Sequence, residues 1–175
     1  VIEAAKACGV PRLVFASSVA AHQLVGDTPR LGSLYAISKA LGEQLVAWAG
    51  AELETTSVRI GSVFGAGRLT TNPIHQMVAE GLASGVVRHP SGDMEPCIEV
   101  GDCARLLAGL ARAERLEPSY DAVRYAPSHA QAASVIAAQT GARLVQTDEP
   151  QSFIYNTVFD VTSLARDSGT AHAPT

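Results

Sequence analysis

The sequence of 175 residues has few cysteines, no cluster of positive charge and no long hydrophobic run. Its three cysteines, Cys8, Cys97 and Cys103, lack CxxC spacing, so neither a disulfide framework nor a zinc site is predicted and a reducing, cytoplasmic setting is expected. A formal net charge of -4 without a Lys/Arg cluster argues against a nucleic-acid partner. No apolar run approaches the ~20 residues that span a bilayer, which argues against a membrane protein.

The sequence also lacks the motifs of a metal site and of a serine hydrolase. The five histidines have no HxxxH or carboxylate spacing, so no metal site is predicted. The segment GSVFG at 61–65 is not the GxSxG turn of a serine hydrolase.

Hydrophobic patterns predict an α/β fold. Residues 13–17 predict a strand buried on both faces, 36–49 predict a helix, and 56–64 predict a second buried strand. This order indicates a parallel sheet with helical crossovers. Further elements are expected as helices at 76–84, at 102–114 with Asp102 as the N-cap, and at 130–139, and as a strand near 123–126.

The helix at 36–49 begins with a tyrosine four residues before a lysine. Tyr35 and Lys39 lie only ~40° apart around a helix, so they share a face. The opposite face is predicted to pack into the core and consists of Ile37, Leu41, Leu45 and Trp48.

The Tyr/Lys pair suits acid/base chemistry. A tyrosine with a pKa near ~10 is a weak base at neutral pH, and a neighbouring ammonium or a positively charged nicotinamide ring stabilises its phenolate. Ser17 and Ser18 end the first strand, where open parallel sheets meet their ligands. By itself, a YxxxK match more often marks the polar edge of a surface helix, with a half-buried Tyr beside a solvated Lys.

Taken together, these segments resemble the extended short-chain dehydrogenase/reductase family of NAD-dependent epimerases, dehydratases and sugar dehydrogenases. The similar segments are AAKACGVPRLVFASSVA, YAISKALGEQL, VRIGSVFGAG, IEVGDCARLL and FDVTSLARDSG. The resemblance implies a Rossmann-like parallel sheet with flanking helices, without its N-terminal strands, and a small C-terminal substrate-binding region. Residues 1–66 are then the second half of an NAD(P)-binding domain. Residues 67–175 are mainly a substrate-binding region, whose helix at 102–114 returns to pack on the sheet.

The resemblance assigns roles by position in these motifs. It makes Tyr35 the acid/base, Lys39 its pKa partner and ribose anchor, and Ser18 the donor to the substrate oxygen. Ser17 is a second candidate for the serine role and a candidate cofactor contact. Gly61 is expected to face the nicotinamide end of NAD or NADP.

The implied substrate is a small sugar or sugar acid that reacts at a hydroxyl-bearing carbon. Ser62 stands where nucleotide-sugar members have an asparagine, and Glu95 stands roughly where they have an arginine that binds diphosphate. A carboxylate there repels a diphosphate. Ser62 and Arg88 are candidate substrate contacts, although Arg88 also fits a solvated surface arginine. A nucleotide-sugar epimerase or dehydratase remains an alternative.

The phosphate-binding fingerprint GxxGxxG of that family is absent from the sequence. We therefore expect that upstream sequence is missing and that these residues alone bind NAD weakly. Two function classes follow: an NAD(P)-dependent oxidoreductase or epimerase, and an inactive fragment or regulatory binding module that keeps the fold. The region of the Tyr/Lys helix is also a candidate homodimer surface.

Overall fold

The computed structural model describes residues 1–24, 34–69, 72–90, 94–148 and 159–170. Its helices are α1 (Ile2–Ala7), the 3-10 helix η1 (Val19–Leu24), α2 (Leu34–Ala49), α3 (Pro73–Ser84), α4 (Val100–Leu110), α5 (His129–Thr140) and α6 (Thr162–Ser168). Its strands are β1 (Arg12–Ser18), β2 (Glu54–Ile60), β3 (Ser62–Phe64), β4 (Val86–Pro90), β5 (Cys97–Glu99), β6 (Ser119–Ala122) and β7 (Arg143–Thr147).

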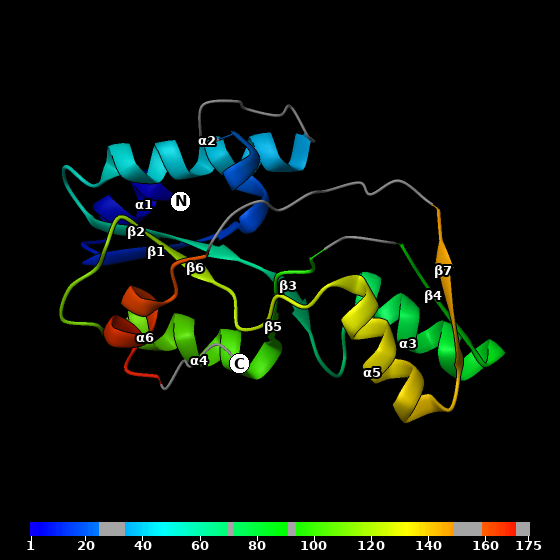
Figure 1. The fold of residues 1–175 in the computed structure, drawn as a ribbon. Helices are drawn as coiled ribbons and strands as arrows, with labels where there is room; N and C mark the ends of the chain where they lie inside the picture. The colour runs from blue at the N-terminus through cyan, green and yellow to red at the C-terminus, as the bar shows by residue number, and fades with distance from the viewer. Residues whose placement is uncertain (25–33, 70–71, 91–93, 149–158, 171–175) are drawn as a thin grey trace.

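The largest sheet has the strand order β1-β2-β6 and is parallel throughout. Helix α2 covers one face of this sheet, and α4 and α6 lie on the other face (Figure 1). Two smaller parallel pairs, β3–β5 and β4–β7, continue away from it. The predicted α/β class with parallel sheets and flanking helices is confirmed.

Two hydrophobic cores stabilise these layers. The first joins α4 and α6 to the three-stranded sheet, and its buried residues are Val58, Ile98, Cys103, Leu106, Leu110, Tyr120, Ala122 and Leu164. The second lies among α3, α5 and β4, and its buried residues are Met77, Val87, Ala133, Ile136 and Ala137.

The expected second strand is divided in two. It was predicted over 56–64, but β2 ends at Ile60 and β3 starts at Ser62 in a different sheet. At Gly61 the backbone changes partner, because Gly61 N donates to Ala122 O at 3.1 Å while Ser62 N donates to Pro96 O at 2.7 Å. A Cβ at Gly61 would lie 2.7 Å from Pro96 O, so this crossing needs glycine.

Three other expectations need correction. The N-cap of α4 is Glu99 and not Asp102, because the Glu99 carboxylate accepts from the backbone N–H groups of Gly101 and Asp102. The helix therefore spans Val100–Leu110 and not 102–114. The strand expected near 123–126 lies earlier, at Ser119–Ala122, where it pairs with β2, and β7 was not predicted.

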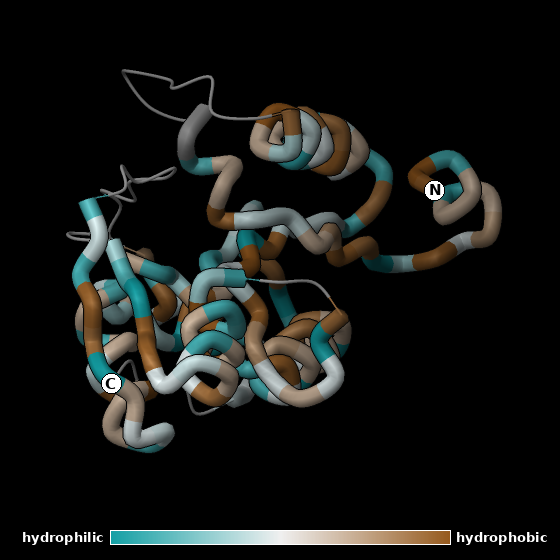
Figure 2. The backbone as a smooth tube through the Cα atoms, turned by 90° about the vertical axis from the view of Figure 1, so that its right-hand side faces the viewer, coloured by the Kyte–Doolittle hydropathy of each residue, from teal (hydrophilic) through white to brown (hydrophobic). Residues whose placement is uncertain are grey.

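The predicted core stripe of α2 and the predicted burial of β1 were also wrong. Leu41, Leu45 and Trp48 are 60%, 59% and 67% exposed, whereas Glu43 and Val46 are buried. Seen end-on near the top of Figure 2, α2 carries hydrophobic positions on the side away from the sheet. Glu43 and Val46 follow Tyr35 and Lys39 at helical spacing, so the side of α2 that carries Tyr35 and Lys39 becomes, further along the helix, the face that packs on the sheet. In β1, at the sheet edge, only the two C-terminal serines are buried.

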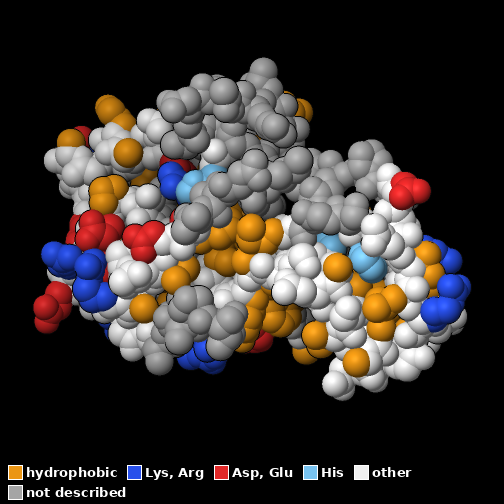
Figure 3. All heavy atoms as spheres, viewed as in Figure 1, with side chains coloured by type: hydrophobic (Ala, Val, Ile, Leu, Met, Phe, Trp, Pro, Cys, Tyr) orange, Lys and Arg blue, Asp and Glu red, His pale blue; other side chains and the backbone are white. Residues whose placement is uncertain are grey.

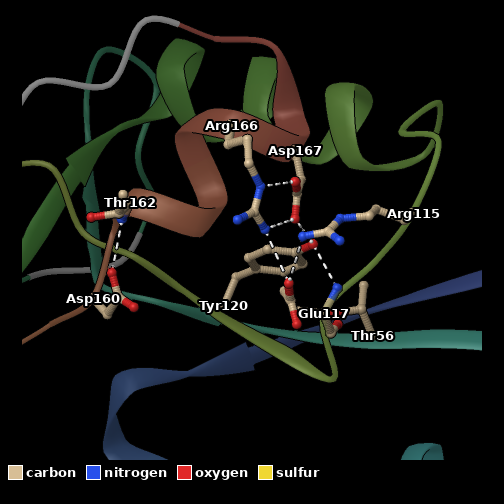
Figure 4. Close-up of polar contacts among 8 residues, drawn as sticks. All are labelled: Thr56, Arg115, Glu117, Tyr120, Asp160, Thr162, Arg166 and Asp167. Atoms are coloured by element: carbon tan, nitrogen blue, oxygen red, sulfur yellow. Dashed lines mark hydrogen bonds and ion pairs between the residues drawn. The ribbon is translucent and has the colours of Figure 1, made fainter.

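A polar cluster attaches α6 to the end of the sheet (Figure 4). The Tyr120 hydroxyl donates to Asp167 at 2.8 Å and accepts from Glu117 N at 2.7 Å. Arg166 donates to Asp167 and to Glu117. Burial raises the pKa of Tyr120 to about 12, and the hydrogen bonds from Arg166 and then Tyr120 lower the pKa of Asp167 to about 2.

Candidate active site

A cavity of about 630 Å³ opens where β1 and β2 end. In parallel α/β sheets, ligands bind outside the carboxyl ends of the strands. The cavity wall brings together all the residues predicted for the site except Arg88, namely Ser17, Ser18, Tyr35, Lys39, Gly61 and Ser62.

Tyr35 and Lys39 enter this cavity from the first two turns of α2. The Lys39 ammonium lies 5.6 Å from the Tyr35 ring centroid and donates to Ala16 O at 2.8 Å. Tyr35 is 55% exposed, so its phenol is accessible to a ligand. An ammonium has three donors, so Lys39 can bind a ligand hydroxyl while keeping its bond to the strand.

The two serines point their hydroxyls to different partners. Ser17 donates to Glu43 at 2.6 Å, so its proton is directed toward α2. The Ser18 oxygen accepts from Ala20 N at 3.3 Å, which leaves its own hydrogen available for another acceptor. This geometry favours Ser18 over Ser17 as the serine that contacts substrate.

Below α2, a buried polar row runs across the sheet and was not foreseen. Ser17, Arg59 and Asp121 are paired in register on β1, β2 and β6. Glu43 accepts from Arg59 at 2.8 to 3.1 Å, and His22 lies 2.7 Å from Asp121. The hydrogen bond to Glu43 raises the pKa of the Arg59 guanidinium. The only signal for this row in the sequence was the helical spacing of Glu43, four residues after Lys39.

On the opposite wall, β3 and the chain before β5 contribute polar side chains. Asn72, the N-cap of α3, donates to Ser62 Oγ at 3.3 Å. Glu95 also lines this cavity, and its Oε2 lies 3.4 Å from His129 Nε2. Asn72 was missed as a site residue; an Asn-Pro pair before a helix indicates an N-cap, not a ligand contact.

Arg88 lies elsewhere. It belongs to β4, pairs with Glu80 of α3 through its guanidinium, and its backbone N–H donates to the same carboxylate at 2.9 Å. Its side chain is 54% exposed. The structure therefore does not bring Arg88 to the cavity that contains Tyr35.

A second, apolar cavity of about 860 Å³ lies between α5 and the loop after β6. Its wall includes Phe64, Tyr125, Val135 and Ile136. Hydrophobic side chains gather near the centre of the face shown in Figure 3, between the α4–α6 layer and α5. None of the predicted site residues lines this cavity.

Within the described part of the chain, no group of three or more His, Cys, Asp or Glu side chains is placed to bind a metal ion. The helices in those same residues are too short or too polar to cross a membrane.

A model of the NAD dependent epimerase/dehydratase family matches residues 1–122, a range that contains every predicted site residue. The chain belongs to this family. No curated protein sequence matches it. The resemblance inferred from the YxxxK helix and the strand before it is thus confirmed.

Solved structures of this family have the same fold. TunA, an NAD-dependent NDP-hexosamine 5,6-dehydratase of tunicamycin biosynthesis, is 18% identical with a TM-score of 0.80, over 98% of this chain and 62% of that chain. MoeE5 in complex with UDP-glucuronic acid and NAD is 24% identical with a TM-score of 0.80, over 99% and 64%. An epimerase from the methanogen Methanothermobacter thermautotrophicus is 17% identical with a TM-score of 0.81, over 99% and 57%. The chain therefore spans less than two thirds of each of these proteins.

Proposed function

We propose that the chain carries the catalytic part of an NAD-dependent enzyme that transfers hydride at a hydroxyl-bearing carbon of a sugar-like substrate. The observation that supports this most is the meeting of Ser18, Tyr35 and Lys39 in one cavity beside Gly61. Family membership and the NAD complexes of similar structures support the cofactor.

The cavity fits the nicotinamide end of the cofactor. Gly61 presents bare backbone on one wall, and Lys39 has donors left for ribose hydroxyls after its bond to Ala16 O. NAD supplies the hydride acceptor when it is bound. The sequence has no GxxGxxG turn for the pyrophosphate, so we propose that residues 1–66 form only the second half of the dinucleotide-binding domain. Residues 67–175 then mainly serve the substrate, apart from α4, which packs on the sheet.

The side chains have separate tasks in this proposal. Tyr35 would remove the proton from the substrate hydroxyl oxygen while the carbon that bears this hydroxyl loses hydride to NAD, and Lys39 would stabilise the phenolate. Ser18 donates its remaining hydrogen to the substrate oxygen and holds it toward Tyr35. Ser17 supports the site from behind, because its proton goes to Glu43.

The test is NADH fluorescence from the full-length protein with NAD and a panel of sugars, sugar acids and nucleotide sugars. Tyr35→Phe is expected to lower kcat by at least ~10²-fold with little change in KM, since it removes the general base but keeps the ring. Full turnover by Tyr35→Phe would show that another group is the base. NADH that accumulates indicates net oxidation, whereas product without NADH indicates that hydride returns to the substrate.

A binding module that keeps the fold without catalysis is the second candidate. Titrating the sugar into the full-length protein with and without NAD distinguishes the two. A module of this kind binds the sugar without needing NAD, whereas the enzyme needs the cofactor in place.

A further inference from the structure

We propose that Ser62 and Glu95 together bind a sugar hydroxyl, and that this pair selects a neutral, hydroxyl-rich sugar over one that carries a phosphate or a nucleotide. The proposal rests on the proposed function, because it names the substrate class of the same cavity. It concerns the wall opposite Tyr35 and Lys39.

Ser62 pairs in register with Cys97 across β3 and β5, and Glu95 lies two residues before Cys97. Ser62 N donates to Pro96 O at 2.7 Å, which places Ser62 beside the residue that follows Glu95. Both side chains line the cavity. A ligand group at this wall therefore meets Ser62 and Glu95 together.

Ser62 is set up to donate. Its oxygen accepts from Asn72 Nδ2 at 3.3 Å, and Asn72 cannot turn freely because its Oδ1 accepts from His75 N at 2.8 Å. Ser62 donates its hydroxyl hydrogen to none of the described residues, so that hydrogen is available to a ligand oxygen.

Glu95 is set up to accept. Its backbone N–H donates to Pro127 O at 2.9 Å, and its Oε2 lies 3.4 Å from His129 Nε2. The Oε1 atom has no hydrogen bond from any described residue, and the side chain is 13% exposed. An ionised carboxylate accepts hydrogen bonds only. Oε1 is therefore available to a ligand that donates.

A donor beside an acceptor matches a sugar hydroxyl, which can accept from Ser62 and donate to Glu95 at once. A phosphate at the same place has no hydrogen for Glu95 and is repelled by it. This differs from the nucleotide sugars named for similar structures, such as UDP-glucuronic acid. Lys39 and Arg68 also line the cavity as cations, and each already donates to a backbone carbonyl.

His129 is a positioning residue in this scheme. It is the first residue of α5, it is 7% exposed, and it lies outside the cavity lining, with its Nε2 3.4 Å from Glu95 Oε2. Its role is to hold Oε2 so that Oε1 faces the ligand.

The experiment measures binding and turnover separately. Saturation-transfer difference NMR on the full-length protein with NAD compares D-glucose and D-galactose with their 1-phosphates and UDP derivatives. NADH fluorescence gives kcat/KM for the same compounds. Glu95→Gln removes the charge, Ser62→Ala removes the donor, and Arg68→Gln tests the competing cation. Glu114→Gln is the matched control, because Glu114 is exposed and lies outside the cavity lining.

We expect the free sugars to be preferred over the phosphorylated ones by at least ~10-fold. Glu95→Gln and Ser62→Ala should each weaken binding of the free sugar ~10-fold or more, as expected for a lost hydrogen bond to or beside a charged group. Glu95→Gln should also reduce the preference for free over phosphorylated sugars. His129→Ala should raise KM without lowering kcat, and His129→Gln, which keeps an N–H donor, should restore it in part.

The proposal is overturned if the protein prefers the UDP sugars and Arg68→Gln reduces that preference. It is also overturned if none of the free sugars shows saturation transfer. Both outcomes are distinct from failure of the proposed function. That failure appears as turnover that does not depend on Tyr35, or as sugar binding by Glu95 and Ser62 without any hydride transfer.

Discussion

Glu43 of α2 lies over the sheet with both carboxylate oxygens bonded to the guanidinium of Arg59 on β2, at distances of 2.8 to 3.1 Å. Glu43 is two helical turns beyond Tyr35 on the same face. The ion pair therefore fixes the rotation of α2, and with it the direction in which Tyr35 and Lys39 point. Ser17 completes the contact by donating to Glu43 at 2.6 Å.

Removing one partner of this pair leaves a charge buried without its counter-ion. Glu43→Ala is expected to lower the free energy of unfolding by ~3–5 kcal/mol, measured by urea denaturation. Glu114→Ala at an exposed position should change it by less than ~0.5 kcal/mol. Equal effects of the two substitutions would mean that the Glu43–Arg59 pair does not hold α2 in place.

Gly61 is expected to tolerate no side chain. In Gly61→Ala, the added Cβ would lie 2.7 Å from Pro96 O, so β3 or the chain before β5 must shift. We expect a loss of ~1–3 kcal/mol of stability and a smaller stabilisation by NAD, both measurable by thermal unfolding of the full-length protein with and without NAD. Gly67→Ala meets no atom within 4 Å but has φ of +82°, so it controls for backbone strain alone. If the Gly67 variant lost as much of the NAD response, crowding at Pro96 would not be the cause.

The Tyr120–Asp167 contact predicts stability changes at both ends of the pH range. The pKa of Asp167 is lowered to about 2, so the stability that it provides is present above its unfolded pKa and is lost as the pH falls from about 4 to 2. The pKa of Tyr120 is raised to about 12, so its contribution is present below its unfolded pKa and is lost as the pH rises from about 10 to 12.

These two ranges can be assigned with two substitutions. Melting temperatures should depend less on pH between about 4 and 2 in Asp167→Asn, and less between about 10 and 12 in Tyr120→Phe. If either variant retained the slope of the natural protein in its own range, that group would not be responsible for it.

Substitutions on the exposed side of α2 can test whether the protein forms the predicted homodimer. Leu45 and Trp48 are 59% and 67% exposed, which is unusual for large apolar side chains on one helix face. If two copies associate through this helix, Leu45→Glu should give a monomer in light scattering, whereas Leu82→Glu on α3, where Leu82 is 72% exposed, should not. If the natural protein is monomeric at high concentration, the homodimer prediction is wrong.

The sequence was informative where local motifs carry the structure. The YxxxK helix and the strand before it were both placed from spacing and residue type. Predictions from the sequence failed where contacts between residues far apart in the chain determine the packing. Counting apolar residues on α2 selected Leu41, Leu45 and Trp48 as the core face, but Arg59, 16 positions away from Glu43, draws the other face to the sheet.

The candidate site shows the same division. Tyr35 and Lys39 are one helical turn apart and could be recognised together, whereas Glu95 and Ser62 reach the same cavity wall only because β3 pairs with β5. Arg88 was chosen from its position along the chain, and the nearer partner Glu80 occupies its guanidinium. Pairing between strands is a non-local property, which residue spacing does not contain.

The edge position of β1 has a practical consequence. Among the described strands, β1 pairs with β2 on one side only, so the backbone groups on its other side form a template for a further parallel strand. If residues 1–66 are the second half of a dinucleotide-binding domain, as proposed, a separately expressed first half can add its strands at β1, which makes the chain suited to fragment complementation. Restored NADH production would then report reassembly, so the two polypeptides together would act as a split-enzyme sensor of their own association.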